Sequence, residues 1–305
     1  MAVSVVSGIL FAVVSIFLLG ALLSSLVKDS KKEHSDDSFL VLDLTMNLTD
    51  RPGGYGLEDL TRQALIEDSS PPQLHLLEVL KALSKAKKDP KVKGIFITGS
   101  FMPSGYGCGY QAIQELLNGL EDFRKSNKPV IGFMHSPKQL DYLVYSNCDE
   151  LFMDPSGTLL INGLVSEQIF LADSFEKYGV GMQIVKVGDF KGAVEPYTST
   201  RYSEENRMQI RKLLKARWSD YLSSIAHGRS IDFLELNQSL ENQFLFRPKQ
   251  AVELGLVDQE LPFDEMLDYL AEIGAPADEE EDGFRKIKLL DYLDRPDSST
   301  PGIED

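Results

Sequence analysis

The sequence predicts an α/β fold with a parallel sheet, preceded by one transmembrane helix. Apolar runs typical of strands alternate with helical stretches of about ten to fifteen residues, which is the pattern of βαβ units. A long uncharged stretch stands at the amino-terminal end, before the first strand. The composition of the 305 residues, 43% hydrophobic and 26% charged, is typical of a globular protein with room for one large or two modest domains.

The first half of the chain supplies most of the predicted sheet. The run at residues 38–44 is almost entirely apolar, which indicates a strand buried on both faces. Leu76, Val79 and Leu83 recur at helical spacing and predict a helix at residues 76–88. The elements that follow are a strand at 92–98, a glycine-rich loop at 99–109, a helix at 110–124, a strand at 128–134, a short helix at 139–145, and short strands at 150–153 and 159–161.

The second half is predicted to be mainly helical. A helix at 171–178 precedes a strand at 183–187, which breaks at Gly188. Ser203 opens the longest helix, which extends to about Ala226, because serine caps helices and the following glutamates suit the positive helix end. Further helices are predicted at 248–254 and 264–273, and one more ordered piece at 284–293.

Residues 1–27 are predicted to be a membrane anchor, and residues 28–37 a polar linker. Residues 3–27 carry no charge, and as a helix they would extend about 37 Å, enough for a bilayer core of about 30 Å. A cleaved signal peptide would have a shorter apolar core and a basic start. Lys28 and Lys31 follow the span, so the positive-inside rule alone places the body in the cytoplasm.

The net charge and the spacing of Cys and His argue against nucleic-acid binding and against a metal site. A net charge of −16 argues against a nucleic-acid-binding face, which needs clustered Lys and Arg. Cys108 and Cys148 do not have a metal-binding spacing, and the sequence leaves open whether they pair. The four histidines are scattered without ligand spacing, so no metal site is predicted.

Residues 185–197 contain the main candidate for chemistry, Lys191. Its sequence neighbours Phe190, Gly192 and Ala193 are small or apolar, which suggests partial desolvation and a lowered pKa. A neutral lysine can take the proton of a serine hydroxyl, as in Ser-Lys nucleophile activation. The alternative interpretation is an ordinary surface lysine that follows a strand.

The segment from Gly188 to Pro196, Gly-Asp-Phe-Lys-Gly-Ala-Val-Glu-Pro, resembles the Gly-x-Tyr/Phe-Lys-Ser-Ala-Val-Glu-Pro segment of the signal peptide peptidase A (protease IV) family. Lys128-Pro129-Val130, the helix after Ser203 and residues 251–258 recur in that family in the same order. The resemblance covers about residues 38–295 and is to the amino-terminal half of the long, two-half form.

The resemblance implies a Clp-protease/crotonase-like fold of repeated ββα units at residues 38–274, a peptidase half-domain. Residues 275–305 would then be an acidic linker or tail leading toward a second half. The resemblance also implies that Lys191 is the general base and that no cofactor is needed. It further implies oligomers with active sites at subunit boundaries, and a body on the extracytoplasmic side of the cytoplasmic membrane.

The nucleophile that this family requires is missing from its expected place. In the serine-bearing half, the serine stands ten residues after the valine of Lys-Pro-Val, and here that position is Leu140. Ser136 and Ser146 are too far away in register, and Ser136 more simply starts a helix before Pro137.

The other parts of the family's motif are only partly retained. The two glycines of its oxyanion turn fall on Gly107 and Cys108, a possible remnant of that turn. Glu195 and Pro196 are expected to shape the backbone after the lysine, because a residue before proline is disfavoured in helix.

Three functions are compatible with these features. The first is a membrane-anchored serine endopeptidase with a Ser-Lys dyad that digests cleaved signal peptides or other peptides. This chain would supply the base, and a serine-bearing second half, on the same or another chain, would supply the nucleophile. The second is an inactive pseudo-protease half that acts as a scaffold or gate in an oligomer. The third, an acyl-CoA enzyme of the crotonase group, shares the implied fold, but no feature of the sequence favours it.

Overall fold

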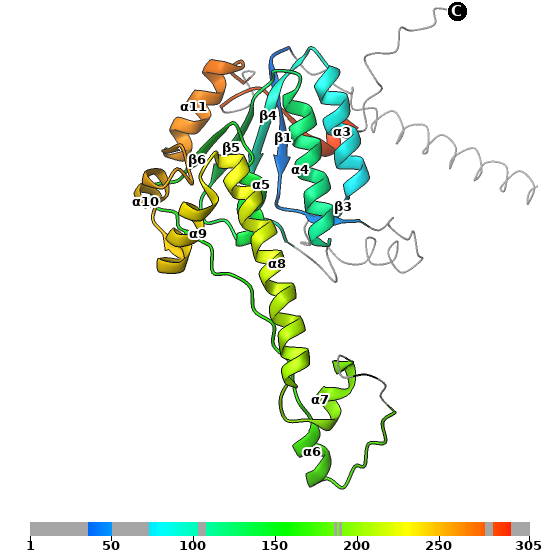
Figure 1. Cartoon of the computed structure of the whole chain (residues 1–305). Helices are drawn as coiled ribbons and strands as arrows, with labels where there is room; N and C mark the ends of the chain where they lie inside the picture. Colours follow the sequence, from blue (N-terminus) through cyan, green and yellow to red (C-terminus); the bar gives the residue numbers. More distant parts are fainter. Residues whose placement is uncertain are drawn as a thin grey trace, which may run out of the picture.

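A computed structural model describes residues 36–50, 73–102, 108–185, 188, 191–277 and 283–293. Within these residues the centre of the fold is a six-stranded sheet in which every neighbouring pair of strands is parallel (Figure 1). Its strands are β1 (Ser38–Asp43), β4 (Val92–Thr98), β5 (Val130–Met134), β6 (Glu150–Met153), β9 (Gln259–Glu260) and β10 (Lys286–Lys288). Their order across the sheet is β10-β1-β4-β5-β6-β9.

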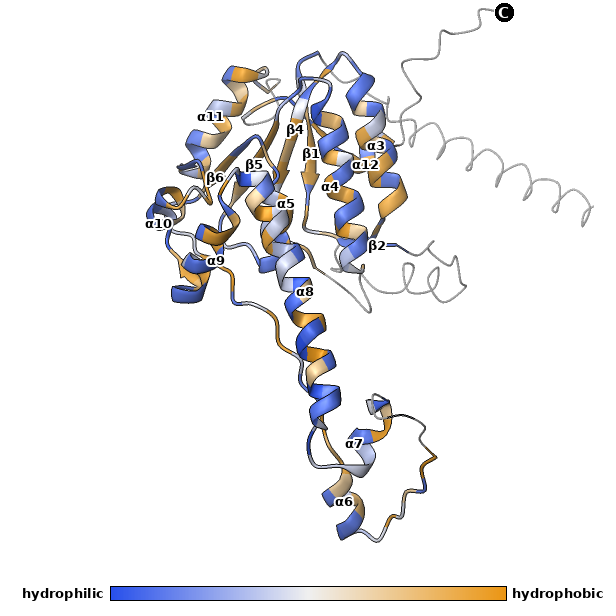
Figure 2. Cartoon of the chain, in the orientation of Figure 1, coloured by the Kyte–Doolittle hydropathy of each residue, from blue (hydrophilic) through white to orange (hydrophobic). Residues whose placement is uncertain are grey.

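Both faces of the sheet are covered, as the apolar strands require. Successive residues of β4 point to opposite faces: Ile95 and Ile97 join the larger of two hydrophobic clusters, and Phe96 joins the smaller. Figure 2 shows the apolar residues concentrated in the strands of this body. The larger cluster includes residues of α3 (Leu76–Lys88), α4 (Tyr110–Arg124) and α5 (Gln139–Tyr145), and the smaller one includes residues of α11 (Phe263–Ile273).

The remaining short elements complete the body. α9 (Phe233–Asn242) is capped by Asp232, whose carboxylate accepts hydrogen bonds from the amides of Leu234 and Glu235. The other elements are β2 (Asn47–Thr49) paired with β3 (Gln73–His75), β7 (Leu159–Leu160) paired with β8 (Leu245–Phe246), α10 (Pro248–Glu253) and α12 (Leu289–Leu293).

A long extension leaves the body, and we call residues 162–220 the arm. It contains α6 (Ala172–Lys177), the 3₁₀ turn η1 (Gly192–Val194), α7 (Glu195–Thr198) and the first part of α8 (Glu204–Arg229). The buried residues of α8 all lie near its carboxyl-terminal end, at Tyr221, Leu222, Ile225 and Ala226. Figure 1 shows α8 projecting from the body, with α6 and α7 beyond its amino-terminal end.

The arm is anchored to the body through the end of α8. The guanidinium of Arg229, with 6% of its side chain exposed, lies 2.5 Å from the carboxylate of Asp258. The second oxygen of Asp258 accepts a hydrogen bond from the amide of Leu151 in β6 at 2.7 Å. The carboxyl-terminal end of α8 is therefore joined to the central sheet through Asp258.

Most of the predicted elements agree with the structure, including the helices at 76–88, 110–124 and 139–145. The predicted strand at 183–187 is wrong for residues 183–185, which form no strand, because they lie in the arm without a neighbouring strand to pair with. The strand formers there are unburied, and Val185 is 98% exposed. α9 was not predicted.

The body extends beyond the boundary expected at residue 274. β10 pairs with β1 in parallel, and the side chains of Phe284, Ile287, Leu289 and Tyr292 are buried. Residues 283–293, which the sequence assigned to a tail, therefore belong to the core of the body.

The predicted anchor at residues 1–27 and the linker up to residue 35 lie outside the described residues. In the part of the chain that the structure describes, we find no helix with the length and apolarity needed to cross a bilayer.

Candidate active-site elements

Leu140, at the position expected for the nucleophile, is the second residue of α5 and is 37% exposed. The residue before it, Gln139, forms two hydrogen bonds with the backbone of Gly163: its Nε2 donates to the carbonyl at 3.2 Å, and its Oε1 accepts from the amide at 3.1 Å. The hydroxyl of Tyr221 donates to the carbonyl of Gln139 at 2.9 Å. The start of α5 is thus held between α8 and the beginning of the arm.

Asp141 fixes the same end of α5 to the loop after β4. Its buried carboxylate accepts hydrogen bonds from Ser100 Oγ at 2.6 Å, from the amide of Phe101 at 2.9 Å and from the amide of Lys138 at 2.7 Å. The ammonium group of Lys138 donates to the carbonyl of Phe101 at 2.8 Å. Sequence reasoning missed Asp141, although an acidic residue three positions after a helix cap is a recognisable signal.

Of the two residues assigned to the oxyanion turn, Gly107 lies outside the described residues. The thiol of Cys108 is partly buried, and its pKa is raised first by burial and then by the negative charge of Asp50. Cys148 is fully buried, and burial raises its pKa strongly. Both cysteines are free thiols, so they do not pair, and raised pKa values oppose formation of a reactive thiolate.

Two serines near α5 have structural roles. Ser136 does not start the helix, as the sequence suggested, because α5 begins at Gln139; instead its hydroxyl accepts a hydrogen bond from the amide of Thr158 at 3.3 Å. Ser146 is completely buried, and its hydroxyl donates to the carbonyl of Leu143 at 3.0 Å.

Lys191 lies in the arm, immediately before η1, and its side chain is exposed. Among the described residues, no element buries the Lys191 side chain, so the desolvation expected from its sequence neighbours is not seen there. Gly188, which precedes it, has a φ of +91°, a backbone conformation that favours glycine.

The residues after Lys191 are held firmly to α8. Glu195 is 4% exposed, and its carboxylate accepts hydrogen bonds from the amide of Ser203 at 3.1 Å, from Ser203 Oγ at 2.5 Å and from Asn206 Nδ2 at 2.9 Å. The carbonyl of Pro196 accepts a hydrogen bond from the amide of Leu171 at 2.7 Å. The backbone beside the lysine is therefore fixed even though the lysine side chain is exposed.

A single chain does not bring Lys191 to the position of Leu140. Tyr221 contacts the start of α5, and at a rise of 1.5 Å per residue Glu204 lies about 26 Å away from it along α8. Figure 1 shows α7, which follows Lys191 closely, at the outer part of the arm, and α5 in the body. Within one chain, the lysine and the position expected for the nucleophile therefore lie apart, near opposite ends of α8 (Figure 1).

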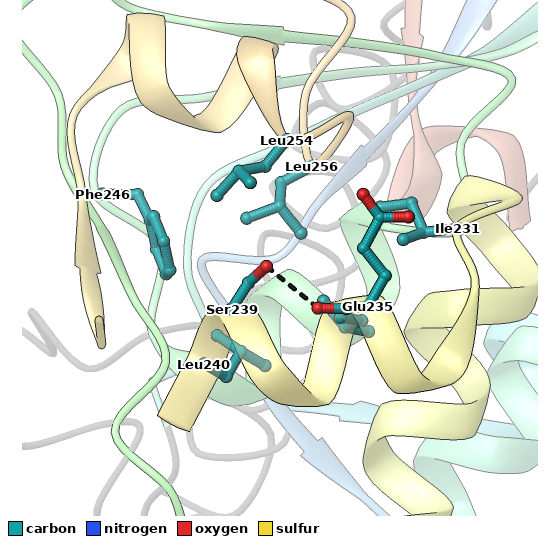
Figure 3. Close-up of a pocket in the computed structure, with 8 residues that line it drawn as sticks. Ile231, Glu235, Ser239, Leu240, Phe246, Leu254 and Leu256 are labelled. Atoms are coloured by element: carbon teal, nitrogen blue, oxygen red, sulfur yellow. Dashed lines mark hydrogen bonds between the residues drawn. The ribbon is translucent and has the colours of Figure 1, made fainter. Parts of the chain in front are cut away.

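A crevice in the body offers no substrate site. It lies between α9, β8 and the loop at residues 254–256, with a volume of about 10 Å³, close to the space of one water molecule (Figure 3). Its walls are mostly apolar, and the Ser239 hydroxyl there donates to the carbonyl of Glu235 at 2.9 Å. Within the described residues, no cluster of three His, Cys, Asp or Glu side chains is arranged to hold a metal ion.

Comparisons with known proteins identify relatives of this chain. Residues 122–275 match the sequence profile of Peptidase family S49, a range that contains both Leu140 and Lys191. The chain is 27% identical to Protease 4 of Haemophilus influenzae over 53% of its own length and 26% of that protein. It is 27% identical to Serine protease SPPA, chloroplastic, of Arabidopsis thaliana over 72% of its length and 31% of that protein. With Protease 4 of Salmonella typhi it shares 25% identity over 74% of its length and 35% of that protein. The matched region thus spans a quarter to about a third of each relative.

Proposed function

Because the chain belongs to peptidase family S49, a family of serine-type peptidases, we propose that it is one half of a serine endopeptidase, with Lys191 as the general base. The serine is supplied by a second half, on the same or a separate polypeptide. The parallel sheet with helices on both faces is consistent with a Clp-protease/crotonase-like body.

The observation that carries this proposal is the position of Lys191, exposed on a projecting arm whose backbone is fixed by Glu195. To accept a proton from serine, the lysine must be neutral, and burial favours the neutral amine. Docking of the arm on a serine-bearing half would bury Lys191 and bring it to the nucleophile in one step. An exposed, well-positioned lysine supports an active site formed at a boundary between halves or copies.

The proposed substrates are cleaved signal peptides or other released peptides. The proposed location is the cytoplasmic membrane, with residues 3–27 as a single anchor and the body on the extracytoplasmic side. Carbonate washing of membranes tests the anchor. We expect the intact chain to stay in the membrane pellet, and a soluble body would contradict anchoring.

Reconstitution tests the catalytic role. The purified chain alone is expected not to hydrolyse a casein-type substrate, whereas a mixture with a serine-bearing half of a family S49 peptidase is expected to do so. In that mixture Lys191→Met should lower kcat by about 10²- to 10⁴-fold, the usual effect of losing a general base. Lys212→Met, an exposed lysine on α8, is the matched control and should leave the rate unchanged. Near-normal turnover by Lys191→Met would refute the role of the lysine.

A second candidate function is a pseudo-protease half that acts as a scaffold or gate, and Leu140 at the exposed start of α5 favours it. Under both proposals a fluorophosphonate probe should not label the purified chain, and a labelled serine would reveal a nucleophile of its own. The two candidates differ in the reconstituted assembly: a scaffold would retain its assembly with the serine half, while hydrolysis would be insensitive to Lys191→Met.

A further inference from the structure

The arm contains an open groove that the catalytic proposal does not use. It has a volume of about 370 Å³, within the size range of ligand sites in proteins. The groove runs along α8 opposite Ser166 of the extended segment before α6. The half-buried side chains of Tyr202, Ile210 and Leu214 form its apolar floor.

Three exposed cations line the same groove: Arg207, Arg211 and Lys215. Their spacing of four residues places them in one row on α8. Between positions 201 and 217 the sequence has six basic and two acidic side chains, whereas the whole chain has a net charge of −16. The groove is therefore a local cationic site on an otherwise acidic protein.

The row of cations has no anionic partner among the described residues: no hydrogen bond or ion pair of Arg207, Arg211 or Lys215 is formed there. Like charges four residues apart on a helix repel and destabilise it. A bound anion would remove this repulsion, so the arrangement favours an anionic ligand.

The groove begins at the part of α8 that contacts residues 191–194, which we call the lysine loop. Gly192, next to Lys191, packs against the side chain of Asn206, which directly precedes Arg207. At the same end of the groove, the ring of Tyr202 contacts Phe170 with a centroid distance of 5.1 Å. A ligand held in the groove would thus lie near the proposed base.

We propose that this groove binds the free carboxyl-terminal end of an apolar peptide substrate, an inference that rests on the proposed peptidase function. The guanidinium group of Arg211, at the centre of the row, binds the terminal carboxylate, since Arg forms paired hydrogen bonds with carboxylates. Arg207 and Lys215, four residues to either side, add to its attraction. The floor of Tyr202, Ile210 and Leu214 binds the apolar side chains that precede it.

The combination of floor and cations selects this ligand. A peptide released by proteolysis has a new carboxylate at its end, and an intact precursor has an amide bond at the same place. An acidic segment of another copy, such as residues 278–282, would match the cations but would bring no apolar side chains to the floor. The groove would therefore distinguish released peptides from uncleaved ones.

Fluorescence anisotropy with the full 305-residue chain tests the proposal without any serine half. The probe is a short amino-terminally labelled peptide of alternating Ala and Leu, prepared with a free carboxyl terminus and with a carboxyl-terminal amide. We expect the free carboxylate to bind roughly tenfold or more tightly than the amide, as for hydrogen bonds to a charged group, and to weaken as salt is raised. Arg211→Gln and Lys215→Gln should remove this preference, and Lys212→Gln, an adjacent lysine that does not line the groove, should retain it.

Equal binding of the acid and the amide would overturn the proposal, as would tighter binding of an amidated Asp-Glu-Glu-Glu-Asp peptide, which would identify the groove as a contact between copies. The result is independent of catalysis. Carboxylate-selective binding without hydrolysis in the reconstituted assembly would refute the peptidase function alone. Hydrolysis with no preference for free carboxylates would refute the groove's role alone.

Discussion

The hydroxyl of Ser203 lies 2.5 Å from Oε1 of Glu195, while the amide of the same serine lies 3.1 Å from Oε2. Ser203 is also the N-cap of α8, since its hydroxyl accepts a hydrogen bond from the amide of Asn206 at 3.2 Å. One buried carboxylate therefore joins the loop after Lys191 to the first turn of α8. Its negative charge lies at the positive end of that helix, where it is favourable.

Glu195→Ala is expected to loosen the lysine loop without unfolding the body. The substitution leaves the amide of Ser203 and the side chain of Asn206 without their acceptor, and such losses cost about 1–3 kcal/mol. Hydrogen exchange should become faster by about tenfold or more at residues 192–206 and remain unchanged in β4 and β5. Glu204→Ala, an exposed residue in the same turn, is the control. Unchanged exchange at residues 192–206 would show that Glu195 does not hold the loop.

Gly192→Ala is expected to displace Asn206. A Cβ at residue 192 would collide with the amide group of Asn206, which also donates to Glu195. The single variant should therefore lose stability locally by about 1 kcal/mol or more, measured as faster exchange of the same loop. In the double variant Gly192→Ala with Asn206→Ala the collision is absent, so the two effects should be less than additive. Strict additivity would contradict the contact.

The body was predictable because its local patterns agree with its packing. In α4, Ile113, Leu116 and Leu120 recur at helical spacing, and the structure buries all three. The arm was not predictable in the same way. Residues 183–185 have strand-forming side chains, but a strand exists only with a neighbour, and local sequence does not reveal whether one is present.

The candidate site was predicted residue by residue but not in space. The motif around Lys191 located the lysine and Glu195 along the sequence. Where these residues lie in space depends on how far α8 projects from the body, which the motif does not reveal. The contacts of Asp141 with Ser100 and Phe101 were not predicted, because these two residues stand about forty residues earlier in the chain. Contacts between such distant segments follow from the fold and not from local spacing.

Asp141→Ala is expected to destabilise the body strongly. It leaves the buried amide of Phe101 and the partly buried amide of Lys138 without an acceptor, and a cost of about 2–5 kcal/mol is typical of such a loss. The midpoint of urea unfolding should fall accordingly. Asp122→Ala is the control: its ion pair with Lys87 is half exposed, and exposed pairs contribute up to about 1 kcal/mol. Equal effects of the two substitutions would mean that Asp141 does not anchor α5.

The hydroxyl of Tyr269 is expected to make the body less stable at alkaline pH. Its hydroxyl on α11 donates to the carboxylate of Glu150 at the start of β6. Burial, followed by the hydrogen bond to Glu150 and the charge of Glu150, raises the pKa of Tyr269 from 10.0 to about 12. The folded chain therefore holds the phenol proton to higher pH than the unfolded chain does. The resulting stabilisation is fully present below about pH 10 and is lost as the pH rises through about 12.

Thermal unfolding followed by circular dichroism from pH 8 to pH 12 measures this dependence. We expect the wild-type Tm to fall between about pH 10 and 12. Tyr269→Phe, which removes the phenol, should have a lower Tm at pH 8 and a smaller fall over the same interval, because it has no proton to lose at this position. Tyr178→Phe serves as the control, since Tyr178 lies on the arm and is 77% exposed. Its Tm should follow the wild type across the range. If Tyr269→Phe lost as much stability as the wild type between about pH 10 and 12, the alkaline transition would not originate at Tyr269. The contact between α11 and β6 would then not depend on protonation of the Tyr269 hydroxyl.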